Sequence, residues 1–344
     1  MIRSRVRSWT AIYFLLTFIL VLIPAGLRAI PAAAAGFPDD AALLQTAQRQ
    51  FNSGSYASAI TTLQSAISQT PSDGEAYYWL GRSYYELNDF DSAISAGEKS
   101  IALDPKNSVY HQWLGRIYGG KADRDHSFFF ARKVKEQFSE AVRLNPSNVA
   151  ARRDLEEYDL DAPWIVGGNK DEAKAQVEAI AAIDPVQGHL ARAVLLMAEG
   201  KKVEPAEAEY RQALAAKPKT LEPYFEAADF FARQNKPAGM DEVIQAAAAV
   251  NSTDPRLSYY RGVALVLGNS DAAQAEEDLK SYIASTPPRS DWPSHAAARV
   301  WLGRLYEAQG KVPEAIEQYR AALQLDPGFK EARARLQQLG KNSQ

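Results

Sequence analysis

The chain has 344 residues, of which 46% are apolar and 24% are charged, and these fractions exclude both a wholly disordered chain and a protein with many membrane spans. Its formal net charge of −3 excludes the broad basic excess with which proteins bind nucleic acid electrostatically. Because the chain contains no cysteine, disulfides, zinc–thiolate sites and thiol nucleophiles are excluded as well.

The N-terminal segment has the composition of an export signal. Three arginines among the first seven residues precede an apolar run over residues 9–23, and a small-residue stretch ends in Ala33-x-Ala35. This order predicts a secretory signal over residues 1–35. The alternative is a retained anchor over residues 9–27, which approach the length of about 20 residues that spans a bilayer. Either reading predicts an exported bacterial protein of the periplasm or cell envelope, with membrane contact only through residues 9–27 if the signal is kept.

Behind this segment a six-residue pattern recurs three times. Trp-Leu-Gly-Arg-x-Tyr occurs at residues 79–84, 113–118 and 301–306, and the first two copies lie 34 residues apart. Prolines that close Ala- and Leu-rich runs recur at intervals of 34, 41, 39, 33, 37, 32 and 40 residues. Self-similarity at this period indicates an array of small helical units. The prolines are Pro71, Pro105, Pro146, Pro185, Pro218, Pro255, Pro287 and Pro327.

These residues resemble the tetratricopeptide repeat family, whose 34-residue helix-turn-helix unit has the pattern W-x2-L-G-x2-Y, then A-x3-F, then P. The resemblance implies an all-α fold, a right-handed α-solenoid of about eight repeats over residues 38–340 with a C-terminal capping helix. The expected repeats span residues 40–73, 74–107, 108–148, 149–186, 187–219, 220–253, 254–289 and 296–329, and the cap spans 330–340.

Small residues have a defined place in this pattern. Gly81, Gly115 and Gly303 are expected where the first helix of a repeat crosses the second most closely, opposite alanines such as Ala93 and Ala315. No repeat can bury its apolar stripe alone, so the stacked units are expected to share one continuous core. The last helix, over residues 331–339, is expected to have one apolar and one polar face, and Gly340 is expected to end it.

In this family the concave groove is lined by first-helix residues and holds peptide segments. The resemblance therefore implies a partner-binding groove at Tyr78, Arg82, Tyr85, Gln112 and Arg116, with Arg304 at the matching place in the last repeat. Two arginines one repeat apart suit a peptide carboxylate or acidic side chains. The alternative is that each arginine pairs with a neighbouring Glu on a solvated face. The Lys and Asn of the family's carboxylate clamp are absent, so recognition of a chaperone C-terminus is not expected.

Two repeats are irregular. The repeat at residues 108–148 is seven residues too long, with the excess expected between its helices at residues 119–130. Phe128, Phe129 and Phe130 cannot all face one helix seam, so at least one is expected to contact solvent, a partner or the next repeat. Asp123, Asp125 and His126 make only a weak metal signal in a single loop. Residues 162–170 are not a phosphate loop and are interpreted as a hinge or a change of superhelical pitch.

The chain offers few residues for catalysis. His111, His126, His189 and His295 are scattered, and neither His-Glu-x-x-His nor Gly-x-Ser-x-Gly occurs. The sequence thus predicts a non-catalytic scaffold of the cell envelope that binds a partner protein or peptide, with no cofactor, metal or nucleic acid. Two alternatives stay open: a self-assembling, homo-oligomeric envelope component, and a metal-dependent enzyme that uses residues 119–130.

Overall fold

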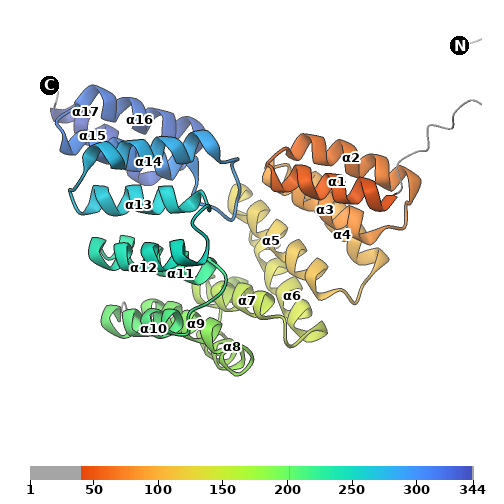
Figure 1. Ribbon diagram of the computed structural model, residues 1–344. Coiled ribbons are helices and arrows are strands. Elements are labelled where there is room, and N and C mark those ends of the chain that lie inside the picture. Colours follow the sequence, from red (N-terminus) through yellow and green to blue (C-terminus); the bar gives the residue numbers. More distant parts are fainter. Residues whose placement is uncertain (1–39, 201, 343–344) are drawn as a thin grey trace, which may run out of the picture. The chain divides into compact units, whose positions relative to one another are not determined.

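The computed structural model describes residues 40–200 and 202–342 of the chain (Figure 1). The predicted secretory signal, its cleavage site and the alternative anchor lie before residue 40, outside the described residues. Within the described ranges every regular element is helical, which confirms the all-α class predicted from the repeats. None of the described helices is long and apolar enough to cross a bilayer.

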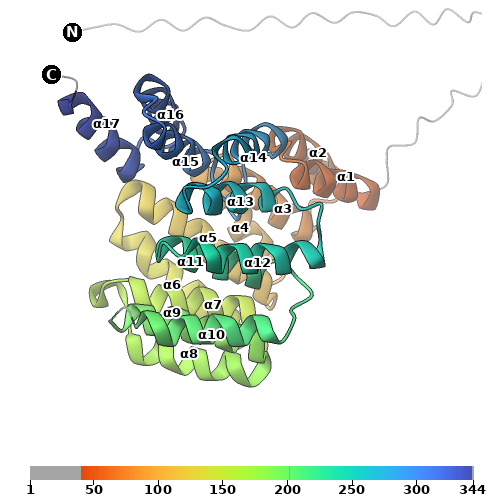
Figure 2. The same cartoon turned by 60° about the vertical axis from the view of Figure 1, so that its left-hand side comes forward.

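The helices form eight consecutive pairs followed by a single terminal helix, and successive pairs pack in chain order (Figure 1, Figure 2). A short 3-10 turn, η1 (Trp164–Val166), stands between the seventh and eighth helices. The helices are α1 (Asp40–Asn52), α2 (Tyr56–Gln69), α3 (Gly74–Glu86), α4 (Phe90–Leu103), α5 (Ser108–Asp125), α6 (Phe128–Leu144), α7 (Val149–Asp161), α8 (Lys170–Ile183), α9 (Pro185–Ala198), α10 (Val203–Ala215), α11 (Glu222–Arg233), α12 (Pro237–Val250), α13 (Arg256–Leu267), α14 (Ala272–Ser285), α15 (His295–Ala308), α16 (Val312–Leu325) and α17 (Lys330–Asn342).

An Asp-Pro dipeptide ends one helix and begins the next between α8 and α9. The backbone N–H of Asp184 donates to the carbonyl of Ile180, and the Asp184 carboxylate accepts the N–H groups of Val186 and Gln187 at 2.9 and 3.1 Å. Pro185 is the first residue of α9, where a helix makes no use of the missing N–H. The fifth pair therefore starts at Pro185, two residues before the boundary expected from the sequence.

Small residues fill the seam within each pair. In six of the eight pairs the second helix presents a fully buried alanine three residues after its start. An alanine at this position brings the two helix backbones close together and leaves no gap to fill. These residues are Ala59, Ala93, Ala173, Ala206, Ala275 and Ala315.

The glycines of the recurring motif lie where the paired helices are closest. A methyl group on Gly81 would lie 3.2 Å from a backbone oxygen of the facing helix. On Gly115 it would overlap the ring of Phe138, and on Gly303 the ring of Tyr319. The close approach predicted for these glycines is therefore present, although aromatic rings rather than alanines face two of them.

The third pair is longer than the others, and its extra residues are helical. α5 continues to Asp125, and after a left-handed His126 the next helix begins at Phe128, with Ser127 as its N-cap. The expectation of a loop over residues 119–130 is therefore wrong, because each helix of the pair is extended instead. Phe128 and Phe129 lie on the added first turn of α6, before its buried face begins at Val134.

The terminal helix covers the last pair, as a cap does. Ala332 and Leu339 of α17 are buried, and Leu336 packs against the same cluster (Figure 2). α17 continues through Gly340 to Asn342, so the expectation that Gly340 ends the helix is wrong. Gly340 has an exposed position with no neighbour to fix a turn, and a glycine without positive φ does not stop a helix.

Substituting two glycines of α5 tests the seam. Gly115→Ala is expected to destabilise the protein by about 1–3 kcal/mol, because the new methyl overlaps Phe138 in a close-packed core. Gly119→Ala is the matched control on the same helix, since its methyl would meet only Val134 at 4.0 Å. That control should gain up to about 1 kcal/mol of helix propensity. Urea unfolding monitored by circular dichroism measures both, and equal stabilities would contradict the close approach.

Candidate functional site

The first helices of successive pairs form a continuous surface. Besides its own partner, each first helix contacts the first helix of the next pair, from α1 to α15. The side chains that these helices turn away from their partners make up what we call the first-helix surface. The residues predicted to line the groove lie on three of these helices, α3, α5 and α15.

Arg82 is surrounded by aromatic rings. Its guanidinium carbon lies 4.7 Å from the ring centroid of Phe51, 4.5 Å from Trp79 and 4.0 Å from Trp113. The Arg82 Nη1 donates to the hydroxyl of Tyr78 at 3.2 Å, and the buried Nε has no hydrogen-bond partner among the described residues. Burial lowers the pKa of Arg82. This arginine is therefore held by cation–π contacts rather than by an acid.

Arg116 is paired with an acid of the next helix pair. Its Nε and Nη2 donate to the two oxygens of Asp154 at 2.8 and 2.9 Å, and the buried Gln112 donates to the same carboxylate at 2.7 Å. Trp113 stands between the two arginines, with Arg116 4.9 Å from its ring. Tyr85 packs edge-on against the same indole. The structure thus brings the five predicted groove residues together, but in contacts with one another and with Asp154.

A second ion pair crosses the surface farther along the chain. Arg153 on α7 reaches Glu226 on α11 at 2.8 Å and so passes over the intervening pair. Glu156 lies beside Arg153, at 3.5 Å, with both carboxylate oxygens buried and without hydrogen-bond partners among the described residues. Burial raises the pKa of Glu156 to about 8. These groups connect the two halves of the first-helix surface.

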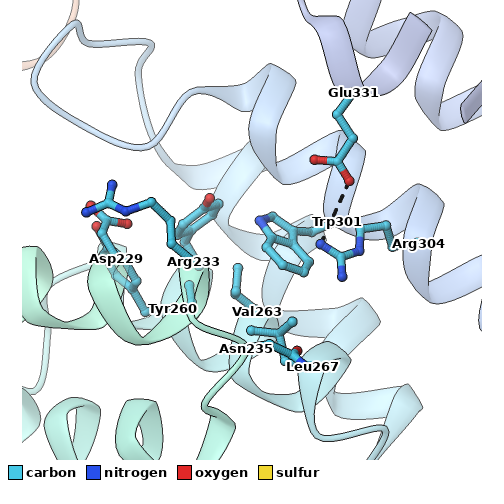
Figure 3. Close-up of a pocket in the computed structure, with 11 residues that line it drawn as sticks. Asp229, Arg233, Asn235, Tyr260, Val263, Leu267, Trp301, Arg304 and Glu331 are labelled. Carbon is cyan, nitrogen blue, oxygen red and sulfur yellow. Dashed lines mark ion pairs between the residues drawn. The ribbon is translucent and has the colours of Figure 1, made fainter. Parts of the chain in front are cut away.

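Beyond this ion pair the surface contains a cavity of about 470 Å³, which we call the arginine pocket (Figure 3). Trp301 lies in its middle, with Asp229, Arg233 and Tyr260 on one side and Arg304 and Glu331 on the other (Figure 3). It is lined by Asp229, Ala232, Arg233, Asn235, Tyr259, Tyr260, Val263, Leu267, Trp301, Arg304 and Glu331, from α11, α13, α15, α17 and the turn after α11.

The arginine pocket contains two guanidinium groups and two carboxyl groups. The Arg304 guanidinium lies 4.1 Å from the Trp301 ring and only 3.8 Å from the nearest Glu331 oxygen, a loose ion pair. Arg233 is exposed and forms no ion pair within the described residues. Burial raises the pKa of Asp229 to about 6, so its carboxyl is mostly ionised at pH 7 and becomes neutral as the pH falls below 6. The two guanidinium groups lose this compensating charge only at mildly acidic pH.

Of the predicted groove residues, only Arg304 lines this pocket. The other five lie elsewhere, on α3 and α5. Sequence reasoning missed its other charged residues, Asp229, Arg233 and Glu331. The repeats that contribute α11 and α13 keep little of the recurring motif, so no position in them was mapped to the groove. The sequence feature that could have indicated this pocket is Arg304, which follows the third Leu-Gly pair.

The two irregular segments of the sequence meet at one edge of the array. Phe128, Phe129, Trp164 and Ile165 form what we call the aromatic edge, with exposed fractions of 64%, 63%, 84% and 49%. Arg132 on α6 donates to the carbonyl of Ile165 at 3.2 Å and joins the two segments. Phe130, in contrast, is half-buried and stacks on Tyr118.

Residues 162–170 are attached to α6 rather than free to move as a hinge. The Tyr158 hydroxyl lies within hydrogen-bond distance of the carbonyls of Ala131 and Val166, at 2.7 and 2.8 Å. Lys135 donates to the carbonyl of Gly167 and lies 2.8 Å from Asp159. These bonds fix the segment against the preceding pair, so we interpret it as a rigid connection.

The weak metal signal of the sequence corresponds to ion pairs. Asp125 accepts from Arg124 at 2.9 Å and lies 2.9 Å from the ammonium of Lys121. His111 has hydrogen-bond contacts with Gln137 and the carbonyl of Pro105, a packing role. Over residues 40–200 and 202–342, no group of three or more His, Asp or Glu side chains is placed to hold a metal ion.

Comparison with known proteins agrees with this architecture. The tetratricopeptide repeat family matches residues 44–108 and 267–328. The crystal structure of yeast Tom70 is similar, with a TM-score of 0.61 and 16% identity over 91% of this chain and 66% of that one. The Cut9 and Hcn1 hetero-tetramer of the APC/C gives a TM-score of 0.50 and 13% identity over 86% of this chain and 55% of that one.

A tetratricopeptide repeat protein from Parabacteroides merdae is also similar, with a TM-score of 0.49 and 14% identity over 87% of this chain and 98% of that one. By sequence, no curated protein matches. The matched stretches cover α1 to α4 and α14 to α16, and they contain two of the three motif copies, at residues 79–84 and 301–306. Residues 44–108 and 267–328 of this chain therefore carry tetratricopeptide repeats, and the helical array has the fold of tetratricopeptide repeat structures.

Proposed function

We propose that this protein is a non-catalytic scaffold that binds an extended segment of a partner protein in the arginine pocket. The observation that carries the proposal is the convergence of Arg233, Arg304 and Trp301 on one 470 Å³ cavity of the first-helix surface. The tetratricopeptide repeats of the chain support it, because such repeats generally mediate protein–protein interaction and are typically non-catalytic. The proposal involves no cofactor and no nucleic acid.

The pocket suits a segment in which acidic and apolar residues stand close together. Arg233 and Arg304 offer planar donors that match carboxylate geometry. Between them Trp301 offers a large, rigid apolar face, which is a common anchor at protein interfaces. The proposed ligand is therefore an acidic segment that carries leucine or aromatic side chains.

The proposed setting is the bacterial cell envelope, outside the cytoplasm. The basic, apolar and small-residue order of residues 1–35 supports export, with the body either released by cleavage or anchored to the inner membrane through residues 9–27. Without residues 1–35 the net charge changes from −3 to −7, because that segment carries four arginines and no acid.

A second candidate function is self-association through the aromatic edge. Phe and Trp side chains each offer about 150–250 Å² of surface, so the exposed fractions of the four residues amount to roughly 500 Å². That area is similar to the largest apolar patch of a typical monomer, and a two-fold pairing of it would bury about 1,000 Å², the lower limit of specific interfaces. Exposed charges of both signs border the edge, Lys170 and Arg132 among the cations and Asp161 among the anions, which suits pairing with a second copy.

Charge reversal tests the arginine pocket. A fluorescent decapeptide in which Asp and Glu alternate with Leu should bind the double variant Arg233→Glu, Arg304→Glu at least tenfold more weakly than the parent, by fluorescence anisotropy. The control variant Lys219→Glu, Arg320→Glu has the same net charge but leaves the pocket intact. Equal loss in both variants, or no loss in either, would contradict the assignment of the pocket.

The affinity of the same peptide should fall as the pH rises from 5 to 8. The pKa of Asp229 is about 6, so its carboxyl is largely neutral at pH 5 and ionised at pH 8, where it repels the peptide's carboxylates. The groups that face Asp229 are Arg233 and Glu226 on its own helix, and Tyr259 and Tyr260 on α13. Asp229→Asn should flatten the pH profile, and an unchanged profile would show that another group is responsible.

Light scattering tests the second candidate on the protein without residues 1–35. If the aromatic edge pairs two copies, Phe129→Ser with Trp164→Ser should convert a dimer to a monomer. Val109→Ser with Leu325→Ser is the matched control, because those side chains are also exposed but lie elsewhere. A monomeric parent protein at 100 µM would refute self-association.

A further inference from the structure

The connection between α14 and α15 contacts helix pairs that precede it by more than 200 positions in the chain. It spans residues 286–294, Thr-Pro-Pro-Arg-Ser-Asp-Trp-Pro-Ser, and has no regular structure of its own. In Figure 1 it leaves the end of α14 on the side where α1 and α3 lie. Its contacts fall into two groups that lie on opposite halves of the segment.

The first half is held by the first two helix pairs. The hydroxyl of Tyr56 donates to the carbonyl of Pro288 at 2.8 Å. The Glu86 carboxylate accepts both the backbone N–H of Ser290, at 2.9 Å, and its hydroxyl, at 2.7 Å. Pro287 lies so close to Gly54 that a methyl group there would overlap its ring.

The second half is held by α13, by α14 and by contacts within the segment itself. The Tyr282 hydroxyl donates to the carbonyl of Pro293 at 2.6 Å. Trp292 lies between two guanidinium groups, with Arg256 5.1 Å and Arg289 4.9 Å from its ring centroid. Arg289 also makes a bidentate pair with Asp291 inside the segment. Release of the first half would therefore leave the second half anchored.

The first half is bound in the way that an extended peptide ligand is bound. One main-chain carbonyl, one main-chain N–H and one hydroxyl are recognised, and a proline ring fills the space that Gly54 leaves open. Consecutive prolines hold a chain extended before it binds, which lowers the entropic cost of binding. Burial raises the pKa of Glu86, and its two hydrogen bonds from Ser290 oppose that rise.

We propose that Gly54, Tyr56 and Glu86 form a peptide site for extended Pro-Pro-x-Ser segments, and that residues 287–290 occupy it as an intramolecular ligand. A partner segment of the same chemistry enters this site by displacing the connection. The site belongs to the first two helix pairs and involves no residue of the arginine pocket, so its test is independent of the proposed function.

A synthetic peptide of residues 284–294, labelled for fluorescence anisotropy, tests the proposal. The released variant carries Pro287→Gly, Pro288→Gly and Ser290→Ala, so its own segment no longer competes. We expect the peptide to bind this variant at least tenfold more tightly than the parent chain. Addition of Glu86→Ala should abolish that binding, and a peptide with Ser290→Ala should bind more weakly. Glu75→Ala, on the same helix but outside the site, is the control and should change nothing.

Absence of binding to a released variant that still melts cooperatively would overturn the proposal, as would equal binding to the released variant and the parent. If the released variant loses its melting transition, hydrogen exchange on the parent chain decides instead. There Glu86→Ala should speed exchange of the Ser290 amide at least tenfold while Glu75→Ala does not, because only Glu86 accepts that N–H. Unchanged exchange at Ser290 would refute the contact itself.

Discussion

The close approach of paired helices determines the path of the whole array. Gly115 and Gly303 let the rings of Phe138 and Tyr319 lie directly on a helix backbone, and in six of the eight pairs a buried alanine brings the two helices close together. Protein interiors pack at nearly crystalline density. The spacing of the two helices in one pair therefore leaves little freedom in the position and orientation of the next pair. The third pair, whose helices are each longer, keeps the same crossing and adds its extra turns beyond it.

The first-helix surface results from this packing, and its charges divide it into regions of different character. Near the N-terminus Arg82 lies among aromatic rings and Arg116 is paired with Asp154, so both guanidinium groups make their main contacts within the protein. Near the C-terminus Arg304 has only a loose partner. Burying paired charges seldom adds much stability, so Arg82 and Arg116 are better understood as fixing the register of adjacent pairs.

The repeats, the glycine contacts and the place of the five groove residues on one surface followed from the sequence, because they depend on side chains less than about 40 positions apart. The alternative to partner binding paired Arg116 with a neighbouring Glu, whereas its partner is Asp154 of the next helix pair, since spacing alone does not say which acid is near. The arginine pocket was missed because α11 and α13 lack the motif. The contact of Tyr56 with Pro288 has no local signal, as the residues are 232 positions apart.

That distance along the chain has a consequence for the order of folding. Arrays of repeats can nucleate at any unit and propagate to their neighbours, since nearly all their contacts are local. A contact that closes a loop of this length costs more chain entropy than any contact between adjacent pairs. The residues around Tyr56 and Pro288 are therefore expected to join after the intervening pairs have formed, and to separate first when the protein is strained or heated. We expect the helices on either side to stay folded when this contact opens. The contact between the connection and the first two helix pairs would then be the least stable part of the array.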